Sequence, residues 1–476
     1  MKKIKNNITY GCAGLAPGKK YKTYCLVFVI GIFALGILNS CKKLIVPNPP
    51  GSNLATSTVF TDSVTAQAAI AGMYNTISSA TYTETLPTRC SFTADELNYL
   101  TTGYNQFTTN TIPVTDPDIE SIWSSSYSII FQANSIIAGV TNSTTLSASF
   151  RNRSLGEALF IRSLCYFYLV NLYGDVPLIL GADLGTNETA PRTATAAVYS
   201  QIISDLKLAQ SYLPANYTFV TGSARTRANK FAATALLARV YLYQSDWVDA
   251  EAQATTVINS TLFALPDDLT TVFTPASQEA IFQFYNSATG YTYYAATVLP
   301  NPVTLVPYYS FTSEQLAAFQ AGDKRRTTWV ASLVYSGTTY YYPYKYKNLT
   351  TGANAEYYTV LRIAEQYLIR AEARAEQNNT SGAITDLNAI HNPGRVNLPL
   401  YAGATDQASV LTAIMNERQV ELFAEWGHRW FDLKRTNTAN TVLGAEKPTW
   451  KSTDVLFPIP QTERTNNSNL TQNPGY

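Results

Sequence analysis

The chain has 476 residues, of which 46% are hydrophobic and 14% are charged, and this balance excludes a disordered chain and allows a large core. Residues 1–40 hold six of the 34 basic residues and no acidic residue, so the remainder carries 28 basic against 33 acidic residues. A mildly acidic body gives no electrostatic reason to bind nucleic acid, and we expect no such partner.

The first 40 residues have the features of a lipoprotein signal peptide. Six lysines precede an apolar run at 25–38. This run is too short for a membrane span and is typical of a signal sequence. The run is followed by Ser40 and Cys41 in the order Leu-Asn-Ser-Cys, which resembles a lipid-attachment sequence. We predict a lipid on Cys41 and a flexible tether at 41–57; the alternative is an uncleaved signal anchor.

Two cysteines, Cys90 and Cys165, lie beyond the leader and the lipid site. The sequence does not decide whether these two cysteines form a disulfide, because two cysteines imply no disulfide framework. Cys165 falls inside an apolar helical pattern, which predicts a buried thiol.

Three helices are expected at the start of the body, which we place at 58–476. The first begins at Asp62 or Ser63, whose side chains can accept hydrogen bonds from free backbone N–H groups. The second follows Asp116, and the third ends near Tyr173, where Gly174 supplies a stop. No second long apolar run follows the leader, so we expect no membrane-spanning body.

Two helix-pair repeats are predicted further along, at 231–260 and 361–390. In each, a small residue on the first helix is followed twelve residues later by an alanine on the second: Ala238 and Ala250, then Ala371 and Ala383. That offset is typical of tetratricopeptide units, in which small side chains let paired helices approach closely. The alternative is an unrelated pair of helices, which leaves the fold class mostly α.

The segment 267–354 differs in composition from the helical segments: it is rich in Tyr, Thr, Pro and Gly, and it lacks helical periodicity. We interpret it as loops and short strands inserted into the helical scaffold. Functional residues commonly occupy such insertions.

Several stretches, in order, resemble the SusD/RagB family of Bacteroidetes outer-membrane nutrient-binding lipoproteins. The similarity covers nearly the whole mature chain, at 59–77, 157–178, 225–258, 322–326, 361–390, 416–435 and 456–476. The resemblance implies a mostly α, SusD-like fold and a lipid-anchored protein exposed on the cell surface. It also implies pairing with a SusC-like TonB-dependent barrel, to which an oligosaccharide, or in some members a peptide, is delivered.

Signatures of enzymes are absent from the sequence, and we expect neither catalysis nor a metal or organic cofactor. The motifs of serine hydrolases, zinc proteases and phosphate-binding loops are missing, and the chain has two histidines, His391 and His428. Asp95 and Glu96 are adjacent acidic residues, but neighbours in sequence seldom face one another. The two catalytic carboxylates of a glycosidase need not be close in sequence, so a glycosidase needs no local motif. Acidic and basic residues at 417–425 recur at helical spacing, which predicts ion pairs along the scaffold.

Tyrosines in loops are the best candidates for ligand binding, because a flat ring covers the apolar face of a sugar while its hydroxyl meets the edge. Two loops, 89–107 and 285–309, offer such rings, and we select five: Tyr99, Tyr104, Tyr291, Tyr293 and Tyr294. If the second loop is extended, Tyr294 faces away from Tyr293.

The sequence therefore predicts a surface glycan-binding lipoprotein. Two alternatives remain: a surface glycoside hydrolase, and a tetratricopeptide scaffold that binds only protein. For the loop tyrosines themselves, the alternative to ligand binding is that they pack locally or face the transporter.

Overall fold

The computed structural model describes residues 56–101, 103–221, 224–285, 290–301, 305–350 and 355–476. The predicted signal peptide, Cys41 and almost all of the tether lie outside these residues. Thr56–Tyr476 forms one compact unit, and most of it is helical.

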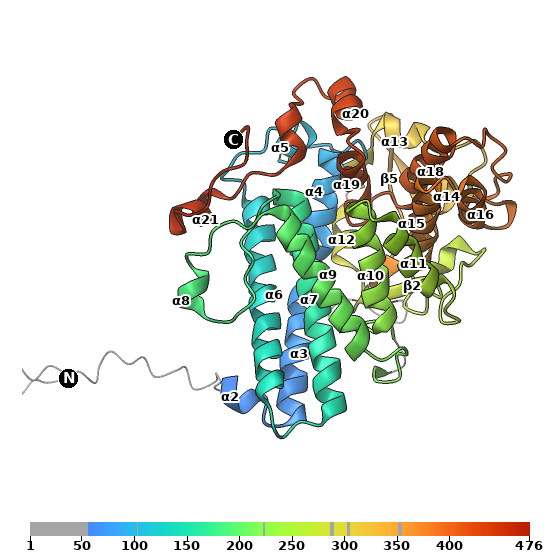
Figure 1. Ribbon diagram of the computed structural model, residues 1–476. Coiled ribbons are helices and arrows are strands. Elements are labelled where there is room, and N and C mark those ends of the chain that lie inside the picture. The colour runs from blue at the N-terminus through green and yellow to red at the C-terminus, as the bar shows by residue number, and fades with distance from the viewer. Residues whose placement is uncertain (1–55, 102, 222–223, 286–289, 302–304, 351–354) are drawn as a thin grey trace, which may run out of the picture. The chain divides into compact units, whose positions relative to one another are not determined.

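Four long helices pack together in the first half of the body (Figure 1): α3 (Ser63–Ile77), α6 (Pro117–Asn142), α7 (Ala148–Tyr173) and α9 (Thr195–Tyr212). The predicted starts are confirmed, since the Asp62 and Asp116 carboxylates accept hydrogen bonds from the first backbone N–H groups of α3 and α6. The predicted stop is also confirmed. Gly174 caps α7 with φ of 73°, a conformation that glycine adopts without strain.

The helix α7 lies at the centre of the body. It is the one helix in the described part that is long and apolar enough to cross a membrane, but 89% of its most apolar window is buried inside the protein. That burial is what a core helix of a folded body shows. Cys165 is buried on α7 as predicted, and both Cys165 and Cys90 are free thiols.

Two helix pairs form the second scaffold: α10 (Lys230–Tyr243) with α11 (Trp247–Ile258), and α15 (Ile363–Glu376) with α16 (Thr380–Ile390). The four alanines that predicted them are fully buried. The pairs stack through α11 and α15, and a 2.8 Å ion pair between Arg374 and Glu251 joins them. The expected helix-pair scaffold is therefore present.

Strands are short and form three separate two-stranded antiparallel sheets in the described part of the chain. They are β1 (Leu97–Tyr99) with β3 (Tyr309–Phe311), β2 (Ala280–Phe284) with β6 (Tyr358–Arg362), and β4 (Val330–Tyr335) with β5 (Thr338–Pro343). Ser336 and Gly337, both with positive φ, turn β4 into β5. The sequence predicts short strands in this part of the chain, but not their pairing with residues 97–99 and 358–362.

The helix α18 (Gln407–Glu421) packs against α15 and α16. Shorter helices complete the described part: α2 (Thr56–Val59), η1 (Thr81–Thr85), α4 (Leu86–Thr93), α5 (Asn105–Thr108), α8 (Leu184–Asn187), η3 (Leu269–Thr271), α12 (Tyr293–Val298), α13 (Ser313–Ala317), α14 (Lys324–Thr328), α17 (Pro393–Val396), α19 (His428–Arg435), α20 (Ala439–Glu446), η4 (Ser452–Val455) and α21 (Gln461–Asn466).

Buried charges join four of these elements at one point. The carboxylate of Glu421, at the end of α18, accepts hydrogen bonds of 2.7–3.0 Å from Arg325 on α14, Arg362 on β6 and Arg395 on α17. Their guanidinium groups lower the pKa of Glu421 well below its ordinary value, against the effect of burial. The expected ion pairs exist, but they link separate elements because these side chains point into the core.

Candidate functional site

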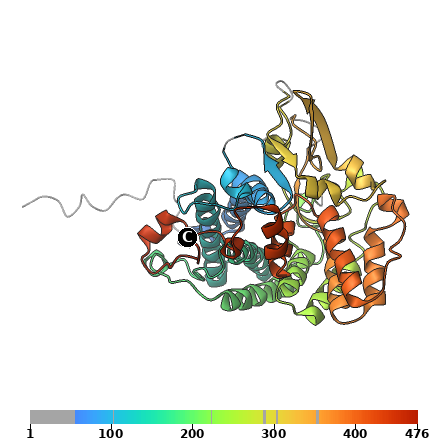
Figure 2. The ribbon, with the colours of Figure 1, turned by 90° about the horizontal axis from the view of Figure 1, so that it is seen from above.

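The two loops chosen from the sequence meet at the β1–β3 sheet. In the antiparallel register Tyr99 lies opposite Tyr309, and the backbone N–H of Leu100 donates to the Tyr308 carbonyl at 2.8 Å. Figure 2 shows β1, in blue, beside the yellow segment that carries β3. The pairing brings side chains about two hundred residues apart in the chain onto one surface.

Five aromatic rings gather there, and we call them the aromatic cluster: Phe92, Tyr99, Tyr104, Tyr308 and Tyr309. Tyr99 packs edge-on against Tyr104 and Tyr309, with ring centroids 4.6 and 5.3 Å apart. Phe92 stacks on Tyr309 at 5.6 Å and on Tyr104 at 6.1 Å. Because each ring touches at least one other, the cluster is held without large side-chain freedom.

Exposure rises across the aromatic cluster. Phe92 is fully buried and Tyr309 is 4% exposed, Tyr99 and Tyr104 are half-buried, and Tyr308 is 40% exposed. Phe92 and Tyr309 therefore form a floor that supports the others. Tyr99, Tyr104 and Tyr308 are the rings of the cluster that keep exposed surface, and Tyr308 is the most exposed.

A buried cation supports the cluster from α4. The guanidinium carbon of Arg89 lies 3.7 Å from the centroid of the Tyr104 ring, and its Nε donates to Asp118 at 2.6 Å. Glu84 lies 3.6 Å from the same guanidinium, and burial raises the pKa of its carboxyl. Burial raises the pKa of the Tyr104 hydroxyl, so this hydroxyl keeps its proton and can donate a hydrogen bond at neutral pH.

The remaining predicted residues lie on or just before α12, which packs against η1. Thr292 caps this helix, so the segment is not extended as the alternation argument assumes. Tyr293 is 43% exposed and Tyr291 is half-buried, so both stay candidates. Tyr294 is 2% exposed and packs on Tyr346 and Tyr358, so its selection as a ligand-binding residue is wrong: the ring is part of the core.

Tyr308 and Arg89 are not among the residues selected from the sequence, although both lie at the edges of the chosen loops. Nothing in the local pattern marks Tyr308 as exposed and Tyr309 as buried. Tyr309 begins β3 and Tyr308 directly precedes it, so their difference in exposure depends on the partner strand β1, which no local pattern identifies. The buried position of Arg89 depends on Asp118, which is 29 residues away.

The histidines occupy structural positions. His428 is 4% exposed, and burial together with Arg239 and Arg418 lowers the pKa of its imidazole well below the ordinary value, so it is neutral. His391 lies 2.9 Å from the Glu417 carboxylate in the buried charge network. Asp95 forms a 2.6 Å ion pair with Arg429. Within the described residues no cluster of three or more His, Cys, Asp or Glu side chains could hold a metal.

Comparison with known proteins identifies the family. A profile described as "starch-binding associating with outer membrane" matches residues 51–242, and the profile of the SusD family matches residues 320–476. The two matches together span more than half of the chain. The chain belongs to the SusD/RagB family. Among its relatives, SusD-like protein P2 of Formosa agariphila is 29% identical, over 96% of this chain and all of that protein.

Solved structures share the fold of this SusD/RagB protein. A SusD superfamily protein of Bacteroides vulgatus superposes with a TM-score of 0.75 at 22% identity, covering 87% of this chain and 99% of that one. A structure described as a laminarin-binding SusD-like protein superposes with a TM-score of 0.73 at 24% identity, covering 87% and 100% of the two chains. At these identities the likeness shows the fold alone.

Proposed function

We propose that this protein binds an oligosaccharide at the aromatic cluster and passes it to a SusC-like TonB-dependent barrel. The proposal depends mainly on the exposure of the rings in the aromatic cluster. Half-buried Tyr99 and Tyr104 and exposed Tyr308 lie over the buried rings of Phe92 and Tyr309. Such a surface suits a pyranose, whose apolar face stacks on a ring while its hydroxyls meet tyrosine hydroxyls. The laminarin-binding neighbour and the starch-binding profile support the same ligand class.

In this proposal the protein is a binding protein and not an enzyme. It is anchored in the outer membrane by a lipid on Cys41 and faces the cell exterior, where glycans are met. The family resemblance supplies the barrel as the partner. Co-purification from native membranes in mild detergent is expected to recover such a barrel in comparable amount, and its absence even after crosslinking would contradict the partnership.

Calorimetry with a panel of oligosaccharides tests the proposed site. Tyr308→Ala, Tyr99→Ala and Tyr104→Ala should each weaken binding by about 1–1.5 kcal/mol, roughly five- to tenfold in affinity, because each removes a stacking face. Tyr335→Ala is the matched control, since Tyr335 is also 40% exposed but lies on β4, outside the cluster.

Thermal melts of the same variants separate binding from folding. Loss of affinity with an unchanged melting temperature supports the site, and equal binding by all three variants and the parent would rule it out. Chromatography of the incubated oligosaccharides is expected to show no products. Product formation would favour the glycoside hydrolase alternative, and failure to bind any glycan would favour a protein-binding scaffold.

A further inference from the structure

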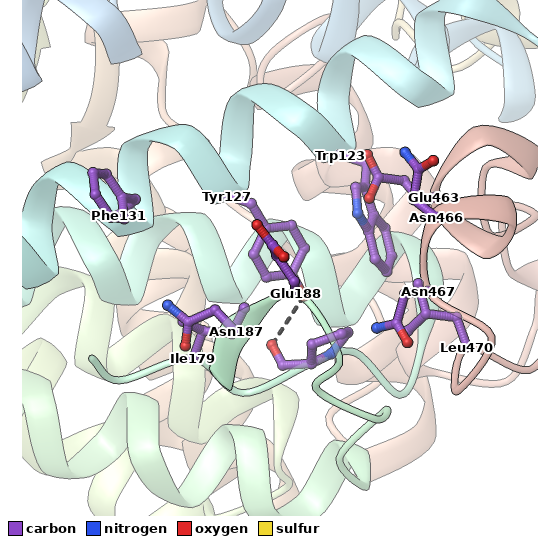
Figure 3. A pocket seen from close by; sticks show the side chains of 11 residues that line it. Trp123, Tyr127, Phe131, Ile179, Asn187, Glu188, Glu463, Asn466, Asn467 and Leu470 are labelled. Atoms are coloured by element: carbon purple, nitrogen blue, oxygen red, sulfur yellow. Dashed lines mark hydrogen bonds between the residues drawn. The ribbon is translucent and has the colours of Figure 1, made fainter. Parts of the chain in front are cut away.

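A cavity that shares no lining residue with the aromatic cluster lies between α6, the chain around α8, and α21. Its volume is about 500 Å³, within the range of roughly 300–1,000 Å³ that small-molecule sites occupy. Figure 3 shows its lining, with aromatic rings from α6 on one side and polar side chains from the α8 and α21 segments around it.

The aromatic side of the cavity is a stripe on a single helix. Trp123, Tyr127 and Phe131 are spaced by four residues along α6, so they share one face of the helix (Figure 3). The Trp123 and Tyr127 rings are 5.1 Å apart, and the Tyr127 hydroxyl donates to the Pro177 carbonyl at 2.9 Å, which holds its ring in place. Phe131 is 37% exposed at the far end of the stripe.

The polar side of the cavity carries hydrogen-bonding groups that a sugar could use. Asn466 and Glu188 are exposed at its rim, and the Asn187 amide nitrogen donates to the Gly181 carbonyl at 3.1 Å. Burial raises the pKa of the Glu463 carboxyl, and burial together with the nearby Glu463 raises the pKa of Glu120. The oxygens of a carboxyl group can accept hydrogen bonds from sugar hydroxyls.

The charges around the cavity favour a neutral ligand. The carboxyls of Glu188, Glu463 and Glu120 oppose an anion. On the other side, the guanidinium of Arg192 lies close enough to Tyr127 to lower the pKa of its hydroxyl, against the larger effect of burial. A neutral, hydroxyl-rich ring with an apolar face fits both the aromatic stripe and the polar rim.

We propose that this cavity is a second binding site for a neutral saccharide, built on the face of α6 that carries Trp123, Tyr127 and Phe131. The ligand class rests on the proposed function, but the surface is a different one. The helix α6 links the two sites: Asp118 in its first turn holds Arg89 under the aromatic cluster, and Tyr127 lies about 14 Å further along the same helix at 1.5 Å per residue.

The test uses the full body with the aromatic cluster disabled by the double variant Tyr99→Ala/Tyr104→Ala. Laminarin, starch, cellulose, xylan and mannan oligosaccharides serve as probes, at millimolar concentration, in calorimetry and in crystals. The double variant is expected to keep weaker but saturable binding. Adding Phe131→Ala or Asn466→Ala should lower that residual affinity about three- to tenfold. Adding Leu208→Ala, a similarly exposed apolar residue on α9, should not.

Each outcome separates the cavity from the aromatic cluster. Sugar density against Tyr127 and Phe131, together with the affinity loss, supports the cavity. If the double variant binds no probe that the parent binds, the cavity proposal fails and the proposed function stands. If neither protein binds any probe, both fail. If arginine ethyl ester, a cationic probe, binds the cavity and the sugars do not, the ligand class is wrong and the proposal is overturned.

Discussion

Glu96 is a carboxyl that the fold buries beside the candidate site. It precedes β1, and its side chain accepts hydrogen bonds from the Ser91 hydroxyl at 2.8 Å and from the Ala424 backbone N–H at 3.0 Å. Burial is the largest effect on this group and raises its pKa from 4.5 to about 7. Glu96 thus holds α4 and β1 against the segment before α19 while being protonated at mildly acidic pH.

This raised pKa predicts a pH dependence of folding. Between pH 4.5 and 7 the native state keeps a proton on Glu96 that the unfolded state has lost, so Glu96 makes stability fall as pH rises through this window. The expected contribution is about 1–3 kcal/mol. Glu96→Gln should flatten the fall, measured by urea unfolding between pH 5 and 7.

Asp62→Asn is the control for that experiment. The hydrogen bonds at the start of α3 hold the pKa of Asp62 below its ordinary value, so its carboxylate is ionised in both states across this range of pH. The variant should leave the slope of stability against pH unchanged. A slope that Glu96→Gln fails to alter would show that Glu96 is ionised in the folded protein.

At the scale of elements, the helix pairs depend on small residues between their helices. Ala238 on α10 is fully buried, as is Ala250 on α11, and the two helices pack closely. A larger side chain at such a position has no space to occupy without moving a helix. The twelve-residue offset between the alanines therefore reflects the need for small side chains where the paired helices approach closely.

Ala238→Leu should destabilise the body by about 1–3 kcal/mol, because the added methyl and methylene groups overfill the space between α10 and α11. Ala252→Leu on the exposed face of α11 is the matched control and should stay within about 0.5 kcal/mol of the parent. Chemical denaturation measures both. Equal stability of the two variants would mean that α10 and α11 adjust freely.

The charge network around Glu421 is also a property of elements and not of one helix. Three arginines from α14, β6 and α17 converge on one carboxylate of α18. Removing one partner of such a buried group leaves uncompensated charge, which costs more than the pair itself contributes. These interactions join α14, β6, α17 and α18 to one another.

For the whole molecule, we predict that a lipid on Cys41 anchors the body to a membrane. A lipid chain partitions into a membrane through its buried methylene groups, so Cys41→Ala should move the protein from the membrane fraction to the soluble fraction. Fractionation and mass spectrometry of the mature protein measure this. A membrane-bound parent with an unmodified Cys41 would contradict lipid attachment and favour an uncleaved signal anchor.

Local features of the sequence are enough to predict much of the scaffold. Capping residues such as Asp62 and Asp116, the stop at Gly174 and the paired alanines act over one or two helical turns or within one helix pair, so their consequences are readable without the fold. Family membership is readable for a related reason, since its motifs lie along the chain in order.

The candidate site can be located from the sequence only as two loops rich in tyrosine. Whether a tyrosine is a core residue or an exposed ring depends on what packs against it. Tyr294 is selected by the pattern and is buried by Tyr346 and Tyr358, whereas Tyr308 is not selected and is exposed. Trp123 on α6 is 2% exposed and belongs to the core, and its ring also borders the cavity next to α21.

Local patterns in the sequence predict three of the long helices and the helix-pair scaffold, because these depend on contacts between residues that are near in the chain. The family follows from the order of its motifs along the chain. The tertiary structure alone decided which rings meet on the surface and which charges converge. The β1–β3 pairing joins residues 97–99 to 309–311, and Glu421 gathers arginines from three elements. Contacts over such separations arise when apolar faces pack together, and no local pattern of residues encodes them.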